Sequence, residues 1–109
     1  MEAVRLTDIA KTIRSKNAGV NQVTFDIIFP DGATYDRVIK SRAITRQTMA
    51  DLFGIPVERI LEFVEFNPAS AIKFTIRRSV PNGSPGDWDV LGCQYYSPLM
   101  DLIIELGTA

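Results

Sequence analysis

The spacing of hydrophobic residues changes several times along the chain, and each spacing predicts one kind of element. Near the N-terminus, apolar residues recur at helical spacing between Leu6 and Ile13. Thr7 is placed to cap this segment, so we predict a first helix from about Asp8 to Lys16. From Gln22 to Phe29 the spacing changes to strict alternation, which predicts a strand with the carboxylate of Asp26 inside it.

The next part of the chain returns to helical spacing. The segment from Pro30 to Gly32 breaks the strand, and Asp31 can cap a second helix around Tyr35. A hairpin strand is the competing interpretation of this segment. Thr45 caps a third helix that ends at Gly54, because glycine readily adopts the left-handed backbone that stops a helix.

The second half of the chain is mostly typical of strands. Ile60–Phe66 fits a helix by its spacing, but its aromatic and β-branched content favours a strand. A turn at Asn67–Pro68 leads into clear alternation over Ile72–Arg77, so these two strands predict a hairpin. Residues 80–89 are rich in turn formers and predict a loop that is long enough to be functional. Alternation over Met100–Leu106 then predicts a last strand.

The order of these elements predicts the fold class. One helix, one strand, two helices and three strands indicate an α+β fold, in which a mostly antiparallel sheet of about four strands has about three helices packed on one face. The 109 residues are enough for one hydrophobic core and too few for two. We therefore predict a single domain over residues 1–109.

Composition and charge narrow the partners and the compartment. The chain carries 12 basic and 13 acidic residues, and a formal charge of −1 gives no field that would attract nucleic acid or anionic lipid. Its apolar runs, such as Leu102–Ile104, are far shorter than the roughly 20 residues of a membrane span. The single cysteine, Cys93, agrees with a reducing environment. We expect a cytoplasmic protein that binds neither nucleic acid nor membrane.

The chain contains no histidine, which is the side chain most used as a general base and as a metal ligand. Catalytic Ser-His-Asp and Cys-His arrangements are therefore excluded within the chain. Cys93 offers no zinc spacing and is more typical of packing than of nucleophilic chemistry. We expect no metal and no cofactor.

A first candidate site is the segment Arg14–Gly19, where Arg14, Ser15, Lys16 and Asn17 precede a glycine. Two cations, a hydroxyl and an amide around a glycine turn could hold an anion. The alternative is ordinary helix termination, since Lys and Asn are also preferred at helix C-termini.

A second candidate is Asp26, with Lys73, Arg77 and Arg78 of another strand as partners. A carboxylate kept ionised by a neighbouring cation could position a substrate or act as a base. The alternative, which we favour, is an edge charge that discourages aggregation, or a structural ion pair.

A third candidate is the loop Pro81–Asp89, continued by Gln94. Its glycines allow close approach of the backbone, while Asp87, Asp89 and Gln94 could orient a polar ligand. The alternative is a connecting loop that Trp88 fixes to the core.

Four blocks of the sequence carry a family resemblance: Ile13–Gly19, Phe25–Phe29, Ala71–Arg77 and Gly83–Asp87. Together they resemble a small, functionally uncharacterised family, domain of unknown function 4387, over nearly the whole chain. Members occur as separate chains or fused behind a larger domain like acyclic terpene utilisation protein A. The resemblance implies a catabolic partner of that kind and no particular reaction.

The same resemblance implies which polar positions match the family. These are Ser15, Lys16, Asn17, Asp26, Lys73, Asp87, Asp89, Gly92 and Gln94. Relatives often carry Gln and His where this chain has Tyr95 and Tyr96, a departure that weakens any mechanism needing an imidazole there.

These observations favour a small accessory subunit or binding module of a catabolic enzyme system that handles acyl or carboxylate metabolites. One alternative is a small lyase or hydratase, with Asp26 or Asp87 as base and Lys16 or Arg14 holding the carboxylate of the substrate. Another alternative is a structural homodimer that uses an exposed sheet edge or apolar patch.

Overall fold

The computed structural model describes residues 2–19, 21–77 and 97–106. Its elements are β1 (Glu2–Arg5), α1 (Leu6–Ile9), β2 (Thr12–Gly19), β3 (Gln22–Ile28), α2 (Gly32–Ser41), α3 (Arg46–Phe53), η1 (Val57–Arg59), β4 (Ile60–Phe66), η2 (Asn67–Ala69), β5 (Ala71–Arg77), α4 (Ser97–Met100) and β6 (Ile103–Leu106). The predicted α+β class is confirmed.

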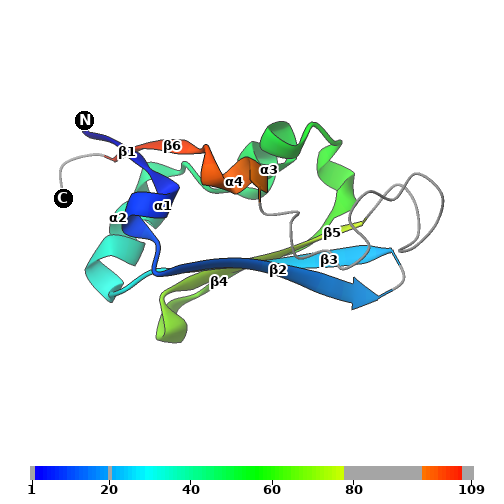
Figure 1. The fold of residues 1–109 in the computed structure, drawn as a ribbon, viewed down its shortest axis with the longest axis horizontal. Helices are drawn as coiled ribbons and strands as arrows, with labels where there is room; N and C mark the ends of the chain where they lie inside the picture. The colour runs from blue at the N-terminus through cyan, green and yellow to red at the C-terminus, as the bar shows by residue number, and fades with distance from the viewer. Residues whose placement is uncertain (1, 20, 78–96, 107–109) are drawn as a thin grey trace.

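The strands form two separate sheets. β2, β3, β5 and β4 lie in that order in a four-stranded antiparallel sheet, built from the two hairpins β2–β3 and β4–β5. β1 and β6 form a two-stranded antiparallel ribbon that joins the two ends of the described chain. The ribbon and the helices α1 to α4 lie together on one side of the four-stranded sheet (Figure 1).

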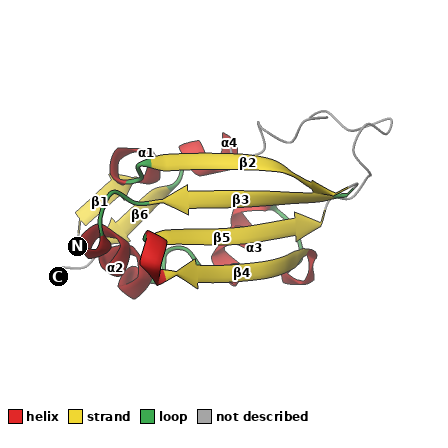
Figure 2. Ribbon diagram, turned by 90° about the horizontal axis from the view of Figure 1, so that it is seen from below, coloured by secondary structure: helices red, strands yellow, loops and turns green. Residues whose placement is uncertain are grey.

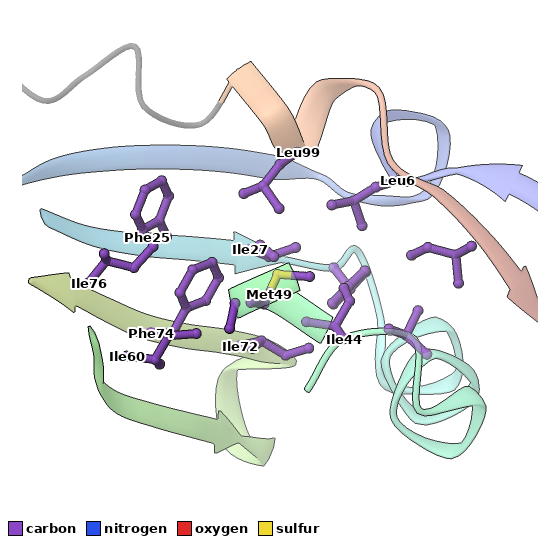
Figure 3. Close-up of a cluster of buried hydrophobic side chains, with 14 of the residues drawn as sticks. Leu6, Phe25, Ile27, Ile44, Met49, Ile60, Ile72, Phe74, Ile76 and Leu99 are labelled. Carbon is purple, nitrogen blue, oxygen red and sulfur yellow. The ribbon is translucent and has the colours of Figure 1, made fainter. Parts of the chain in front are cut away.

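The hydrophobic core fills the space between the sheet and the helices. Phe25 of β3 stacks on Phe74 of β5 with ring centroids 4.9 Å apart, and Phe53 of α3 packs against Phe25 at 5.1 Å. Leu6 and Leu99 close the core from α1 and α4, and both side chains are fully buried (Figure 3). The inner face of the four-stranded sheet is thus covered by side chains from α1, α3 and α4.

Local signals fixed the two longer helices as predicted. The Asp31 carboxylate accepts the backbone N–H of Thr34 at 2.7 Å and starts α2. Thr45 and Thr48 exchange side-chain and backbone hydrogen bonds in a capping box at the start of α3. Gly54 ends α3 with a backbone φ of 67°, in the left-handed region that glycine tolerates. The hairpin alternative for residues 32–41 is wrong.

The predicted strands over 22–29, 60–66 and 72–77 are confirmed as β3, β4 and β5, and β4 and β5 form the predicted hairpin. The predicted last strand is only partly correct. Its first residue, Met100, lies in α4, and β6 starts at Ile103. β6 pairs with β1, a strand that the sequence interpretation missed, and stays outside the four-stranded sheet.

The predicted helix over residues 8–16 is wrong. The helix there is a single turn, α1, and residues 12–19 form β2, which pairs with β3 from Thr12↔Ile28 to Gly19↔Gln22. The physical reason is that Ile13 also fits alternation: it faces the core while Arg14 lies on the other side of the strand. Pairing with the buried strand β3 outweighs the weak helical spacing.

No helix among the described residues is long and apolar enough to cross a membrane.

Candidate functional site

The four-stranded sheet has one face that no described α-helix covers. Seen from that side, the four strands lie in front of α1 to α4 (Figure 2). We call this surface the open face. Because successive side chains of a strand point to opposite sides, the residues that alternate with the core residues belong to it. They are Thr12, Arg14 and Lys16 of β2; Gln22, Thr24, Asp26 and Ile28 of β3; Ala71, Lys73, Thr75 and Arg77 of β5; and Glu62, Val64 and Phe66 of β4.

A charged row crosses the open face. Asp26 is the register partner of Arg14 on one side and of Lys73 on the other. The Nε of Arg14 donates to Oδ2 of Asp26 at 3.0 Å, and the two side chains are 62% and 17% exposed. The carboxylate therefore lies between two cations, one of which bonds to it directly.

The neighbouring row has charges at its two ends and hydroxyls in its centre. Thr24 and Thr75 are register partners, and their Oγ1 atoms lie 3.0 Å apart in a hydrogen bond. Both residues are buried. Lys16 on β2 and Glu62 on β4 are exposed and continue the row outward. Lysine and glutamate thus mark opposite edges of the sheet.

One end of the open face is apolar. Phe66 and Val64 of the edge strand β4 are 52% and 38% exposed, although both are large hydrophobic residues. Ala71 is the register partner of Phe66, and Ile28 is the partner of Ala71 in the next strand. Exposed apolar area beside charged side chains is typical of a protein interaction surface.

The structure brings five of the candidate residues onto this face: Arg14, Lys16, Asp26, Lys73 and Arg77. Arg78 lies outside the described residues. It does not add Ser15, which is the register partner of Phe25 and is buried on the core side. Asn17 lies opposite Val23 in the β2–β3 register. The segment is a strand leading into a turn, so the interpretation as a helix terminus is wrong.

The third candidate segment falls in residues 81–94, which the structure does not describe. Asp87, Asp89 and Gln94 lie outside the described residues. The ability of this loop to orient a polar ligand therefore stays a prediction.

Several residues of the open face were missed by the sequence interpretation. Glu62, Val64 and Phe66 occupy alternate positions of a strand that was correctly predicted, and this alternation is the signal that could have placed them together. The hydrogen bond between Thr24 and Thr75 had no local signal, because it depends on the register between two distant strands.

The open face is more basic than the chain as a whole. It carries four cations, Arg14, Lys16, Lys73 and Arg77, and two carboxylates, Asp26 and Glu62, so four minus two gives a formal charge of +2. The complete chain has a charge of −1. Within the described residues, no three metal-ligating side chains come together to form a metal site. The surface is thus equipped for recognition by charge and apolar contact.

A comparison with protein families matches residues 6–103 to the family described as Domain of unknown function (DUF4387). The chain belongs to this family. The match extends from α1 to the first residue of β6 and includes all four strands of the sheet that bears the open face. Comparisons with curated proteins and with solved structures gave no match. Membership of the DUF4387 family confirms the resemblance to an uncharacterised domain family, while the connection to acyclic terpene utilisation protein A stays a proposal.

Proposed function

We propose that the chain is a small accessory subunit of a catabolic enzyme system that handles acyl or carboxylate metabolites, and that it acts by binding other protein chains. The observation that carries this proposal is the position of the candidate side chains. Arg14, Lys16, Asp26 and Lys73 lie together on a broad sheet face, with large exposed apolar residues beside them.

Exposure favours binding over catalysis at this surface. Arg14 is 62% exposed, so solvent weakens the field that it exerts on a neighbouring group. Catalytic electrostatics is most effective where water is excluded. A sheet face that combines charges and apolar side chains is instead suited to contact with a second protein surface.

The partner that we propose is a larger protein similar to acyclic terpene utilisation protein A. The support for this choice is membership of the DUF4387 family together with the resemblance described above. The chain has no histidine, so the partner would supply the general base that a reaction near neutral pH commonly needs.

Coexpression tests this proposal. The tagged chain is produced together with the protein similar to acyclic terpene utilisation protein A from the same organism, and the purified material is passed over a sizing column. We expect the two chains to elute together in a fixed ratio. Separate elution, with the small chain forming a stable oligomer of its own, contradicts the accessory role.

The lyase or hydratase alternative makes a different prediction. It requires turnover of an acyl or carboxylate substrate by the isolated chain, and loss of that turnover in Lys16→Ala. The observation against it is that Arg14 and Asp26, two of its proposed groups, bond to each other. Turnover by the isolated chain that Lys16→Ala abolishes would replace the accessory role with this one.

A further inference from the structure

We propose that a second copy of this chain covers the open face, and that the two copies are related by a two-fold axis that runs parallel to the strands between β3 and β5. This inference goes beyond the accessory role, because it concerns how the chain assembles with itself. The layer of helices on the other side of each sheet stays free for a larger partner.

The axis determines which residues meet. A half-turn about a line parallel to the strands keeps positions along the strands and reverses the order of the strands. Given the order β2-β3-β5-β4, β2 of one copy lies over β4 of the other, and β3 lies over β5. Each row of side chains therefore faces the same row of the other copy, with the strand order within the row reversed.

In the charged row, Asp26 faces Lys73 of the partner subunit. The symmetry repeats this pair, since Lys73 then faces the partner's Asp26. Arg14 keeps its hydrogen bond to Asp26 within its own chain. An isologous interface thus places opposite charges together at its centre.

In the neighbouring row, Lys16 faces the partner's Glu62, and the symmetry again gives two such pairs. Within one chain these two residues are on opposite edge strands of the four-stranded sheet, three strand spacings or about 14 Å apart. That distance exceeds the screening length of about 8 Å at physiological salt. Salt therefore screens the attraction between Lys16 and Glu62 within one chain, whereas the facing pairs between chains are close enough to contact.

The centre of the same row permits close approach of the two sheets. Thr24 faces Thr75 of the partner subunit, and both side chains are short and already hydrogen-bonded within their own chain. Packed sheets lie about 10 Å apart, and this spacing requires short side chains where the central strands of the two copies face each other.

The apolar end of the open face is covered in the same arrangement. Ile28 faces Ala71 of the partner subunit, and the exposed side chains of Val64 and Phe66 contact the partner's β2. Burial of these side chains is the main favourable contribution, because it removes apolar area from water. Among the described residues, Arg77 has no carboxylate in its row, and it lies in the last row at the end of the sheet, where water can still solvate it.

The size of the face predicts a weak dimer. Four strands of about seven residues cover roughly 19 by 23 Å. The flat area of the two faces together is therefore roughly 900 Å², without the extra surface that protruding side chains add. A specific interface needs about 1,000 Å² in total. The whole face must therefore be used, and we expect a dissociation constant on the order of 10 µM.

Analytical ultracentrifugation of the full chain tests the proposal, with protein from about 1 to 500 µM to bracket the expected constant. We expect a monomer–dimer equilibrium. Lys16→Glu and Glu62→Lys should each weaken the dimer by about tenfold, because each creates two like-charge contacts. The double variant K16E/E62K should restore the wild-type constant. Glu105→Lys, an exposed residue on the β1–β6 ribbon, is the charge-matched control and should leave the constant unchanged.

Circular dichroism establishes that each variant is folded. A chain that stays monomeric over the whole concentration range overturns the proposal. So does a dimer whose dissociation constant is unchanged by both charge reversals, or is not restored by the double variant. Failure here is distinct from failure of the accessory role: a monomer that still elutes with the larger protein contradicts only the dimer. A dimer that never elutes with that protein contradicts only the accessory role.

Discussion

The Nε of Arg14 on β2 lies 3.0 Å from Oδ2 of Asp26 on β3, and the two residues are direct register partners. This cross-strand pair links the edge strand that the sequence did not predict to a strand that it predicted correctly. It also places the proposed cation and the proposed carboxylate in one row with Lys73. The pair is exposed on the Arg14 side, which limits its contribution to stability.

A double-mutant cycle measures that contribution. Arg14→Gln and Asp26→Asn, alone and combined, are compared by urea unfolding at low protein concentration, so that the monomer is observed. We expect a coupling energy below about 1 kcal/mol, the range for exposed ion pairs. A coupling above about 2 kcal/mol would show that the pair is effectively buried, in conflict with its exposure.

The aromatic stack in the core should have a much larger effect. Phe74 is fully buried, stacks on Phe25 and contacts Phe53 and Phe63. Phe74→Ala should lower the free energy of unfolding by about 3–5 kcal/mol, because it removes transfer free energy and leaves a cavity.

Phe66→Ala is the matched control for that substitution, since Phe66 lies on the open face and is 52% exposed. In the monomer it should change the free energy of unfolding by less than about 1 kcal/mol. Urea denaturation of both variants makes the comparison. Equal losses would contradict the separation of a covered inner face from the open face.

The elements that could be predicted from the sequence are those with local signals. Asp31, Thr45 and Gly54 act on backbone groups a few residues away, so capping chemistry alone located α2 and α3. Alternation located β3 and β5 because their core side is continuously apolar, with Phe25 and Phe74 at its centre.

The remaining elements depend on contacts far along the chain. The segment from Leu6 to Ile13 satisfies helical spacing, and only its pairing with β3 makes residues 12–19 a strand. β1 and β6 are four residues each and join opposite ends of the chain, so neither has a local signal for its partner. Asp26 and Lys73 could be proposed as neighbours because both lie in predicted strands. Arg14 could not, because the sequence interpretation placed it in a helix.

The cap at the start of α2 predicts a pH dependence. Hydrogen bonds from the backbone N–H and the side chain of Thr34 lower the pKa of Asp31 below its ordinary value of 3.8. A carboxyl with a lowered pKa in the folded state stabilises the fold above the unfolded value, and this stabilisation is lost as pH falls through the folded pKa. Asp31→Ala should therefore be less stable than wild type at neutral pH, with a difference that shrinks below about pH 3.8.

Thermal unfolding of wild type and Asp31→Ala between neutral and acidic pH measures this difference. Asp36→Ala is the control, because Asp36 lies on the exposed side of the same helix and does not cap it. A difference between wild type and Asp31→Ala that persists at the acidic limit would show that the carboxylate is not the source of the effect.

Tyr35 connects α2 to η2, the turn that follows strand β4, and should produce the opposite pH dependence. Its hydroxyl donates to Oδ1 of Asn67 at 2.6 Å, and the residue is 2% exposed. Burial, followed by the charges of Glu65 and Asp36, raises the pKa of Tyr35 above its ordinary value of 10.0. The unfolded chain loses this proton at lower pH than the folded chain, so stability falls as pH rises above about 10.

Two variants separate the hydrogen bond from the ionisation. Tyr35→Phe and Asn67→Ala both remove the bond and should each lower the free energy of unfolding at neutral pH by about 1 kcal/mol. Only Tyr35→Phe also removes the ionisable phenol, so its stability should fall less steeply above pH 10 than that of wild type or Asn67→Ala. Urea unfolding of wild type and the two variants between neutral pH and about pH 11 measures how the stability of each changes with pH. This range includes the pH at which phenols titrate. Parallel slopes would mean that Tyr35 ionises equally well in the folded and unfolded chains, which its burial on the core side of α2 contradicts.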